Sequence, residues 1–201
     1  MTLDISFDKA SDCAGDERQE EHNYVARLQT GDVRAFEQLF EVYVPRLYRF
    51  VSRTMGVSDI LDVEDVLQET MLAALRTLDR FRGDCSLFTW LCAIARHKVQ
   101  DHIRRQQRLR NRISSEPLDD LRETTGCVSD VGGRVAQQQA LEQALGTLPE
   151  DYRAVLVGKY IEGFTVSELA RVMARSEKSV ESLLTRARSA LRERLVDART
   201  D

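Results

Sequence analysis

Two stretches decide the fold: DVEDVLQETMLAALRTLDRF, residues 62–81, and SLFTWLCAIARHKVQDHIRR, residues 86–105, with only RGDC between them. In both, apolar side chains recur at steps of three and four, which predicts two amphipathic helices. Asp62 is positioned to cap the first helix and Ser86 the second. The predicted core stripes are Val63, Leu67, Met71, Ala74 and Leu78 in the first helix, and Leu87, Leu91, Ile94 or Ala95, Val99 and Ile103 in the second.

The polar faces of these two helices carry opposite charge. Asp65, Gln68, Glu69 and Leu72 share a face of the first helix that cannot also face the core. Three polar side chains around a leucine indicate either a docking surface or an ordinary solvated face. The second helix presents a basic side, made of Arg96, His97, Lys98, Gln100, Arg104 and Arg105. An acidic and a basic helix side by side predict two partners, a basic protein surface and a polyanion.

Composition narrows the class of protein. The chain has 201 residues, 42% of them hydrophobic, and no long segment alternates apolar and polar residues, so we expect an all-α protein. No apolar run is long enough to span a membrane, and the acidic N-terminus lacks the apolar core of a signal peptide. These features favour a cytoplasmic protein with no membrane insertion.

The distribution of charge and the lack of a catalytic motif predict a protein that binds other macromolecules. The net charge is −4, yet residues 96–112 hold seven bases against Asp101 alone. Such blocks fit a protein that touches both DNA and another protein. Cys13, Cys85, Cys92 and Cys127 lack the spacing of a metal site or a disulfide framework, so we expect reduced thiols, with redox sensing open for Cys85. No catalytic arrangement, cofactor motif or metal site is evident, which predicts a protein that is not an enzyme.

The order of segments predicts two helical domains. Residues 1–21 are interpreted as a flexible acidic tail, and residues 22–109 as a first domain whose helices begin at His22 and after the cap Asp32. Pro45 is expected to kink or break the second of these helices. The helix that ends in the basic residues is expected to fray after Arg105. Residues 110–134 lose periodicity and form a predicted linker, either a solvated tether or a segment that follows a basic channel. Residues 135–201 form the second domain.

The second domain contains a predicted helix-turn-helix. Thr165 and Glu168 have the spacing of a capping box, Ala174 lies in a tight turn, and Ser176 can cap a long helix that follows. In this motif the second helix enters the major groove with its N-terminus first. The residues nominated to contact DNA are Arg175, Ser176, Glu177, Lys178, Ser179, Glu181 and Ser182 near the groove, with Arg186 and Arg188 suited to phosphates.

Both halves resemble the sigma-70 family of bacterial RNA polymerase, most closely its small extracytoplasmic-function (ECF) members. The run from Asp62 to Arg96 resembles region 2, and the pattern from Leu148 to Arg192 resembles region 4. The resemblance implies a region 2 helical bundle and a region 4 helix-turn-helix joined by a flexible linker. It also implies core RNA polymerase, promoter DNA and an anti-sigma factor or other regulator as partners.

The resemblance also implies roles for individual residues. The acidic helix would dock on the β′ clamp helices through Asp62, Asp65, Gln68, Glu69 and Leu72. The promoter −10 element would be bound by Arg80, Arg82, Gly83, Asp84, Ser86, Arg96, His97, Lys98, Arg104 and Arg105. Region 4 would bind the −35 element and the β flap. Glu181, Leu183 and His97 depart from residues common in the family, so the promoter sequence is expected to differ from that of better-known relatives.

Two other classes of function stay open from the residues alone. A stand-alone helix-turn-helix regulator would bind a palindromic duplex without polymerase. A protein-only adaptor would show no salt-sensitive DNA binding, which the basic blocks argue against.

Overall fold

The computed structural model describes residues 10–56, 60–113 and 141–197, and within these ranges every regular element is a helix. The elements are α1 (Ala10–Gln29), α2 (Val33–Met55), α3 (Ile60–Thr77), the short 3₁₀ helix η1 (Leu78–Arg80), α4 (Leu87–Ile113), a helical segment over residues 141–146, α6 (Glu150–Tyr160), α7 (Val166–Met173) and α8 (Glu177–Asp197). The predicted all-α class is therefore confirmed.

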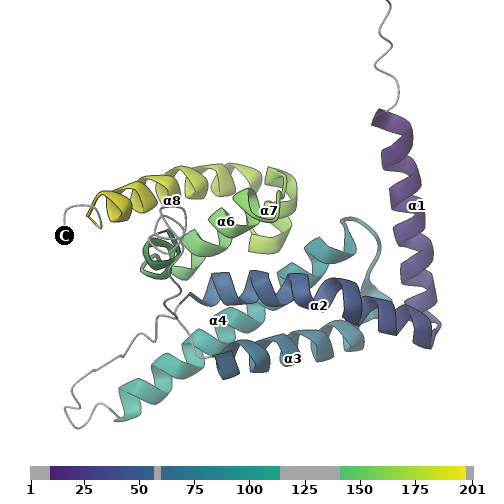
Figure 1. Cartoon of the computed structure of the whole chain (residues 1–201), viewed down its shortest axis with the longest axis horizontal. Helices are drawn as coiled ribbons and strands as arrows, with labels where there is room; N and C mark the ends of the chain where they lie inside the picture. The colour runs from purple at the N-terminus through teal and green to yellow at the C-terminus, as the bar shows by residue number, and fades with distance from the viewer. Residues whose placement is uncertain (1–9, 57–59, 114–140, 198–201) are drawn as a thin grey trace, which may run out of the picture.

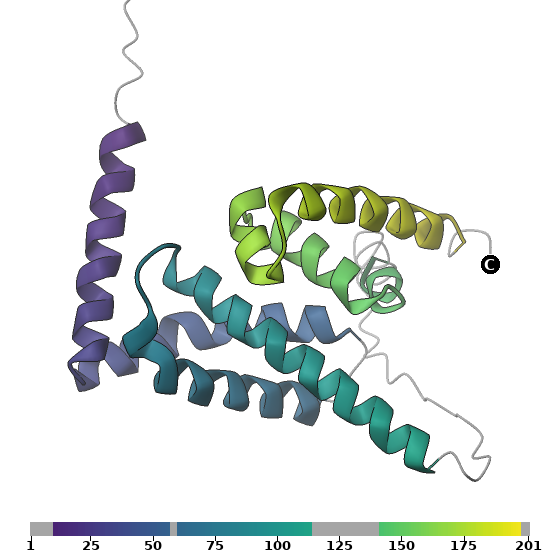
Figure 2. The same cartoon turned by 180° about the vertical axis from the view of Figure 1, so that it is seen from behind.

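The helices form two groups that pack face to face (Figures 1 and 2). The first group contains α2, α3 and α4, and the second contains α6, α7 and α8. Helix α4 packs on α2 and α3 and also on α7, while α2 packs on α6. Helix α1 contacts α2 and η1 at one end and projects away from the rest (Figure 1).

Side-chain caps place four helix starts where the sequence predicts them. The Asp32 carboxylate accepts from the backbone N–H of Arg34 at 3.0 Å. The Ser86 hydroxyl accepts from the N–H of Thr89 at 3.1 Å, and the Ser176 hydroxyl from the N–H of Ser179 at 3.3 Å. Thr165 and Glu168 form both bonds of the predicted capping box. Each cap satisfies a backbone donor that the helix itself cannot pair.

Three predicted helix boundaries are wrong. Helix α1 begins at Ala10, not at His22. Helix α3 begins at Ile60, so Asp62 lies in its first turn and is not its N-cap. Helix α4 does not fray after Arg105 but continues to Ile113. The rest of the predicted linker, residues 114–134, and the start of the second domain lie outside the described residues.

Pro45 does not break α2, which continues from Val33 to Met55. Proline in a helix interior removes one hydrogen bond and costs about 3 kcal/mol. Pro45 itself is exposed, whereas Leu47 and Phe50 just beyond it are fully buried. Burying each such side chain contributes about 1.5–3 kcal/mol, which offsets the proline's cost and keeps the helix continuous.

A single hydrophobic cluster runs through both groups of helices. It includes Phe50 and Leu91 from the first group and Val155 and Leu169 from the second. The predicted stripe of α4 is confirmed at Leu87, Leu91, Ala95 and Val99, all of which are buried. Tyr160, the last residue of α6, is 60% exposed.

Candidate protein and nucleic-acid interfaces

The acidic face of α3 is present and accessible. Asp65 and Gln68 are exposed, and Leu72 is 48% exposed. Glu69 is half-buried and pairs with Lys98 Nζ at 3.5 Å and Arg105 Nη1 at 3.3 Å. Burial raises the pKa of Glu69, but the Arg105 hydrogen bond and the charges of Arg105 and Lys98 outweigh it and leave that pKa below its ordinary value.

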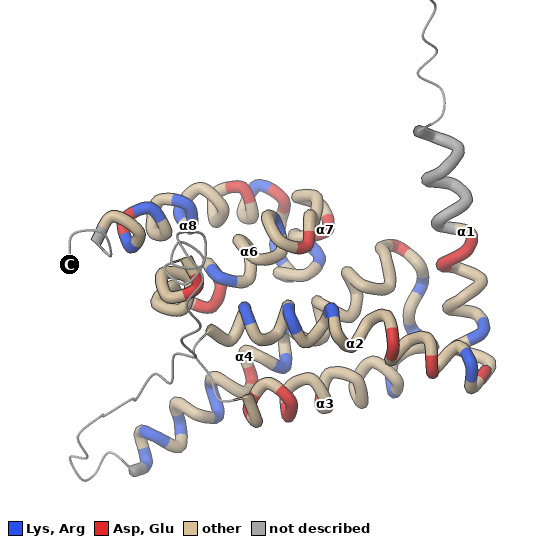
Figure 3. Tube along the Cα trace, in the orientation of Figure 1, with Lys and Arg blue, Asp and Glu red and all other residues tan. Residues whose placement is uncertain are grey.

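The same contacts join the acidic helix to the basic one. Figure 3 shows basic positions along the far end of α4 beside acidic positions on α3. His97, Arg104 and Arg105 are exposed and Lys98 is half-buried, so these four predicted DNA-binding residues share an accessible side of α4. Asp62 lies 3.3 Å from Nε2 of His102. The two surfaces predicted from the sequence are therefore neighbours on one side of the molecule.

Arg96 lies apart from the other predicted bases. It is only 3% exposed, because the second group of helices covers its side of α4. Its Nη2 donates to Asp151 Oδ1 at 2.6 Å, and its Nη1 lies 3.5 Å from the carbonyl oxygen of Met173. In this arrangement Arg96 is inaccessible to DNA.

The loop before α4 exposes four of its predicted site residues: Arg80, Arg82, Gly83 and Asp84. Gly83 has a φ of +75°, a conformation that glycine adopts without steric cost. Ser86, the fifth, is half-buried at the start of α4. There the backbone N–H of Leu87 donates to Glu21 Oε1 of α1 at 2.7 Å. A carboxylate from the N-terminal helix thus caps the helix that carries the basic residues.

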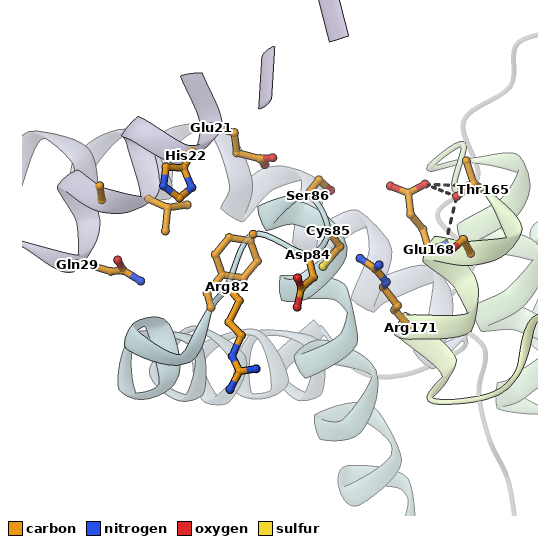
Figure 4. A pocket seen from close by; sticks show the side chains of 15 residues that line it. Glu21, His22, Gln29, Arg82, Asp84, Cys85, Ser86, Thr165, Glu168 and Arg171 are labelled. Atoms are coloured by element: carbon orange, nitrogen blue, oxygen red, sulfur yellow. Dashed lines mark hydrogen bonds between the residues drawn. The ribbon is translucent and has the colours of Figure 1, made fainter. Parts of the chain in front are cut away.

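A cavity of about 910 Å³ opens between this loop, α1 and α7. Figure 4 shows Glu21 and His22 on one side, Asp84 and Cys85 on the loop, and Arg171 directed toward Cys85 from α7. Burial raises the pKa of the Cys85 thiol, although the charge and hydrogen bond of Arg171 oppose this. Burial also raises the pKa of Cys92 well above its ordinary value. Neither environment favours the thiolate that redox sensing would need.

Helices α7 and α8 form the predicted helix-turn-helix. Leu169, Val180, Leu184 and Ala187 are buried and fix the two helices together, and Ala174 makes the turn in the left-handed region with a φ of 51°. The nominated residues Ser176, Glu177, Lys178, Glu181, Ser182, Arg186 and Arg188 are exposed, and Ser179 is half-buried. The first turns of α8 are therefore free to approach a DNA groove.

Arg175, in the turn between α7 and α8, forms an ion pair with Asp151. Its Nη2 donates to Asp151 Oδ2 at 2.5 Å. Sequence reasoning missed Asp151, its neighbour Glu150 and the cap Glu21, because each acts on a residue far away in the chain. Spacing reports on local periodicity, and it carries no signal for such contacts.

Two family models match the chain. Sigma-70 region 2 matches residues 39–109, and Sigma-70 region 4 matches residues 138–191. The ECF RNA polymerase sigma factor SigM of Mycobacterium tuberculosis is 30% identical over 191 residues, which cover 95% of this chain and 92% of that protein. This chain belongs to the ECF sigma factors.

Further likenesses agree with this family. The ECF RNA polymerase sigma-E factor of Escherichia coli K12 is 30% identical over 177 residues, covering 83% of this sigma factor and 90% of that protein. The structure of CnrH in complex with the cytosolic domain of CnrY shares 29% identity with a TM-score of 0.63, covering 89% of this chain and 97% of CnrH. A sigma factor RpoE from Bartonella quintana, solved with the anti-sigma factor NepR, matches with a TM-score of 0.64 at 22% identity over 81% of this chain and 98% of that one, which shows the same fold.

No described helix has the length and apolar character needed to cross a membrane. No cluster of His, Cys, Asp and Glu in the described ranges could hold a metal ion.

Proposed function

We propose that the acidic face of α3 docks this sigma factor on the clamp helices of core RNA polymerase. A sigma factor of this family binds core polymerase, recognises promoter −10 and −35 elements and promotes DNA melting and initiation. The observation that carries the assignment is an exposed leucine, Leu72, surrounded by Asp65, Gln68 and Glu69 on one accessible face. An apolar anchor within a polar rim is the usual anatomy of a protein interface.

Promoter contacts are assigned to two separate surfaces. The loop with Arg82 and Gly83, together with Lys98, Arg104 and Arg105 of α4, would hold the melted −10 strand. Unstacking a base costs a few kcal/mol, so phosphate contacts and a pocket for the flipped base are needed to trap the open strand. The start of α8 would read the −35 duplex in its major groove. The protein contributes binding and no catalytic chemistry, and it acts in the cytoplasm, where core polymerase is found.

A protein regulator is a further expected partner of this sigma factor. One structural relative is described in a complex with an anti-sigma factor, and another in a complex with a cytosolic domain. On this basis we infer that an anti-sigma factor or an equivalent regulator binds the present chain.

Run-off transcription with purified core polymerase tests the function as a whole. The template is the DNA upstream of this protein's own gene, and the expected result is a discrete transcript that requires the added chain. If no transcript forms and the chain also fails to bind core polymerase, the stand-alone helix-turn-helix regulator becomes the better description.

The docking face is tested by reversing its charge. We expect Asp65→Lys with Glu69→Lys to abolish binding to core polymerase in a pull-down while the helical signal in circular dichroism is unchanged. The matched control is Glu37→Lys with Glu41→Lys, which reverses two exposed acids at the same spacing on α2 and should leave binding intact. Assembly of holoenzyme by the α3 double variant would show that the docking face lies elsewhere.

A further inference from the structure

Asp151, near the start of α6, joins the two groups of helices. Its Oδ1 accepts from Arg96 of α4 at 2.6 Å, and its Oδ2 accepts from Arg175 beside α8 at 2.5 Å. The neighbouring Glu150 accepts from Gln100 at 3.2 Å, and its Oε1 lies 3.8 Å from Arg96 Nε. One carboxylate therefore holds a guanidinium nominated for the −10 element together with one nominated for the −35 element.

Other contacts between the two groups extend this arrangement. Thr89 of α4 donates to Glu168 of α7 at 3.2 Å. Arg46 of α2 pairs with Glu162 at 3.1 Å and also lies over the ring of Phe88, 3.6 Å from its centroid. Phe88 in turn packs against Phe164, with ring centroids 5.9 Å apart. The two groups are thus joined by both polar and apolar contacts.

This closed arrangement is incompatible with a promoter bound at both elements. The −10 and −35 elements are separated by about 25 base pairs, or roughly 85 Å of B-form DNA at about 3.4 Å per step. Arg96 and Arg175 share the two oxygens of one carboxylate. The two groups of helices must therefore separate before the chain can contact both elements.

The charges at the junction favour a contact that can be released. Arg96 Nε and Glu150 Oε1 are buried and lack a hydrogen-bond partner. Burial raises the pKa of Glu150 although the nearby Arg96 charge opposes the shift. A buried ion pair with incomplete hydrogen bonding gives little net stability, but removing one partner leaves the other charge uncompensated. Arginine binds phosphate with the same planar donors that it offers to a carboxylate, so DNA competes for these side chains.

We propose that Asp151, supported by Glu150, is an intramolecular latch that keeps the free sigma factor closed by holding Arg96 of the first group, while Arg175 of its own group binds the other oxygen of the same carboxylate. Release of Arg96 from Asp151 exposes that guanidinium and lets the two groups of helices part. The proposal rests on the proposed function, since it assumes that the two groups bind separated promoter elements.

Hydrogen exchange of the full chain without polymerase tests the latch directly. In Asp151→Asn, which keeps the side-chain shape and removes the charge, we expect amides in α7 and in residues 88–99 of α4 to exchange at least about tenfold faster. Small-angle X-ray scattering should show a larger radius of gyration. The variant should also bind a 30-base-pair duplex of arbitrary sequence several-fold more tightly. Glu37→Gln, which makes the same charge change at an exposed site on α2, should match the wild type in all three measurements.

Unchanged exchange and an unchanged radius in Asp151→Asn would overturn the latch. If that variant loses its helical signal, Arg96→Gln decides, because it breaks the same contact from the first group; faster exchange in α7 supports the latch and unchanged exchange rejects it. Run-off transcription separates the two hypotheses. Faster exchange in Asp151→Asn together with no transcript from the wild-type chain contradicts the proposed function alone, whereas a wild-type transcript with no opening in the variants contradicts the latch alone.

Discussion

Arg153 is a buried cation that donates hydrogen bonds to three backbone carbonyls. Its Nε donates to the carbonyl of Thr54 at 2.9 Å, and its Nη1 donates to those of Gly146 at 2.8 Å and Leu148 at 2.9 Å. Desolvation lowers the pKa of Arg153, although the Glu150 charge opposes this. One side chain thereby ties the end of α2 to the start of α6. A Cβ on Gly56 would lie 2.7 Å from Arg153 Nη1, so only glycine leaves room for this contact.

Replacing Arg153 by alanine should destabilise the fold. Three carbonyls would lose this donor, two of them in buried hydrogen bonds, and each buried unsatisfied group costs about 1–3 kcal/mol. We expect Arg153→Ala to lower the free energy of unfolding by about 3 kcal/mol or more, measured by chemical denaturation. Arg49→Ala, at an exposed position on α2, is the control and should change it by less than about 0.5 kcal/mol. Equal effects of the two substitutions would mean that the buried contact contributes nothing.

Helix α4 depends on a neighbour that periodicity did not reveal. Its first turn is capped from within by Ser86 and from outside by Glu21 of α1. A carboxylate at a helix N-terminus is favoured both by the hydrogen bond and by the positive end of the helix dipole. Helix α1 therefore positions the loop that is proposed to capture the −10 strand.

Glu21→Ala should loosen the start of α4. Loss of a capping acceptor costs about 1 kcal/mol, so the amides of Leu87 and Phe88 should exchange several-fold faster in hydrogen-exchange measurements. Glu20→Ala is the matched control, because Glu20 is the adjacent exposed acid of the same helix. Identical exchange at Leu87 in the two variants would show that α1 does not hold this loop.

At the scale of the whole molecule, the described helices share one continuous hydrophobic core. Buried residues of α2 and α4 belong to the same cluster as those of α6, α7 and α8. Helices that share a core are expected to unfold together. The domain division predicted from the sequence, with boundaries at residues 21, 109 and 134, stays a prediction.

Cooperative unfolding can be tested with two spectroscopic probes, tryptophan fluorescence and circular dichroism. Trp90 is the sole tryptophan, and it packs against Phe81 with ring centroids 5.3 Å apart, so its fluorescence reports on the first group alone. Circular dichroism reports on all helices. We expect the two thermal transitions to coincide within about 1–2 °C in the wild type. Separate transitions would show that the two groups are independent domains in solution.

The features that depend on short-range contacts, namely helix starts and buried stripes, could be predicted from the sequence. The three- and four-residue periodicity predicted the buried stripe of α4, and short polar side chains at Asp32, Ser86, Thr165 and Ser176 predicted helix starts, because caps and stripes depend on neighbours within one or two turns. The exposed face of α3 and the helix-turn-helix followed from the same rule. Periodicity gave no warning that α2 would continue through Pro45, since that outcome depends on what Leu47 and Phe50 bury.

Only the tertiary structure decided which charges are free. From the sequence, Arg96 and Lys98 are equally good candidates for DNA binding. In the structure Arg96 is buried against Asp151, whereas Lys98 pairs with Glu69 at the surface. The difference arises because α6 and α7 cover one side of α4, and packing between distant segments leaves no periodic trace in either. The sequence thus determined the helices, their polar faces and the family, while the packing of the two groups determined which of the predicted contacts are available before the chain opens.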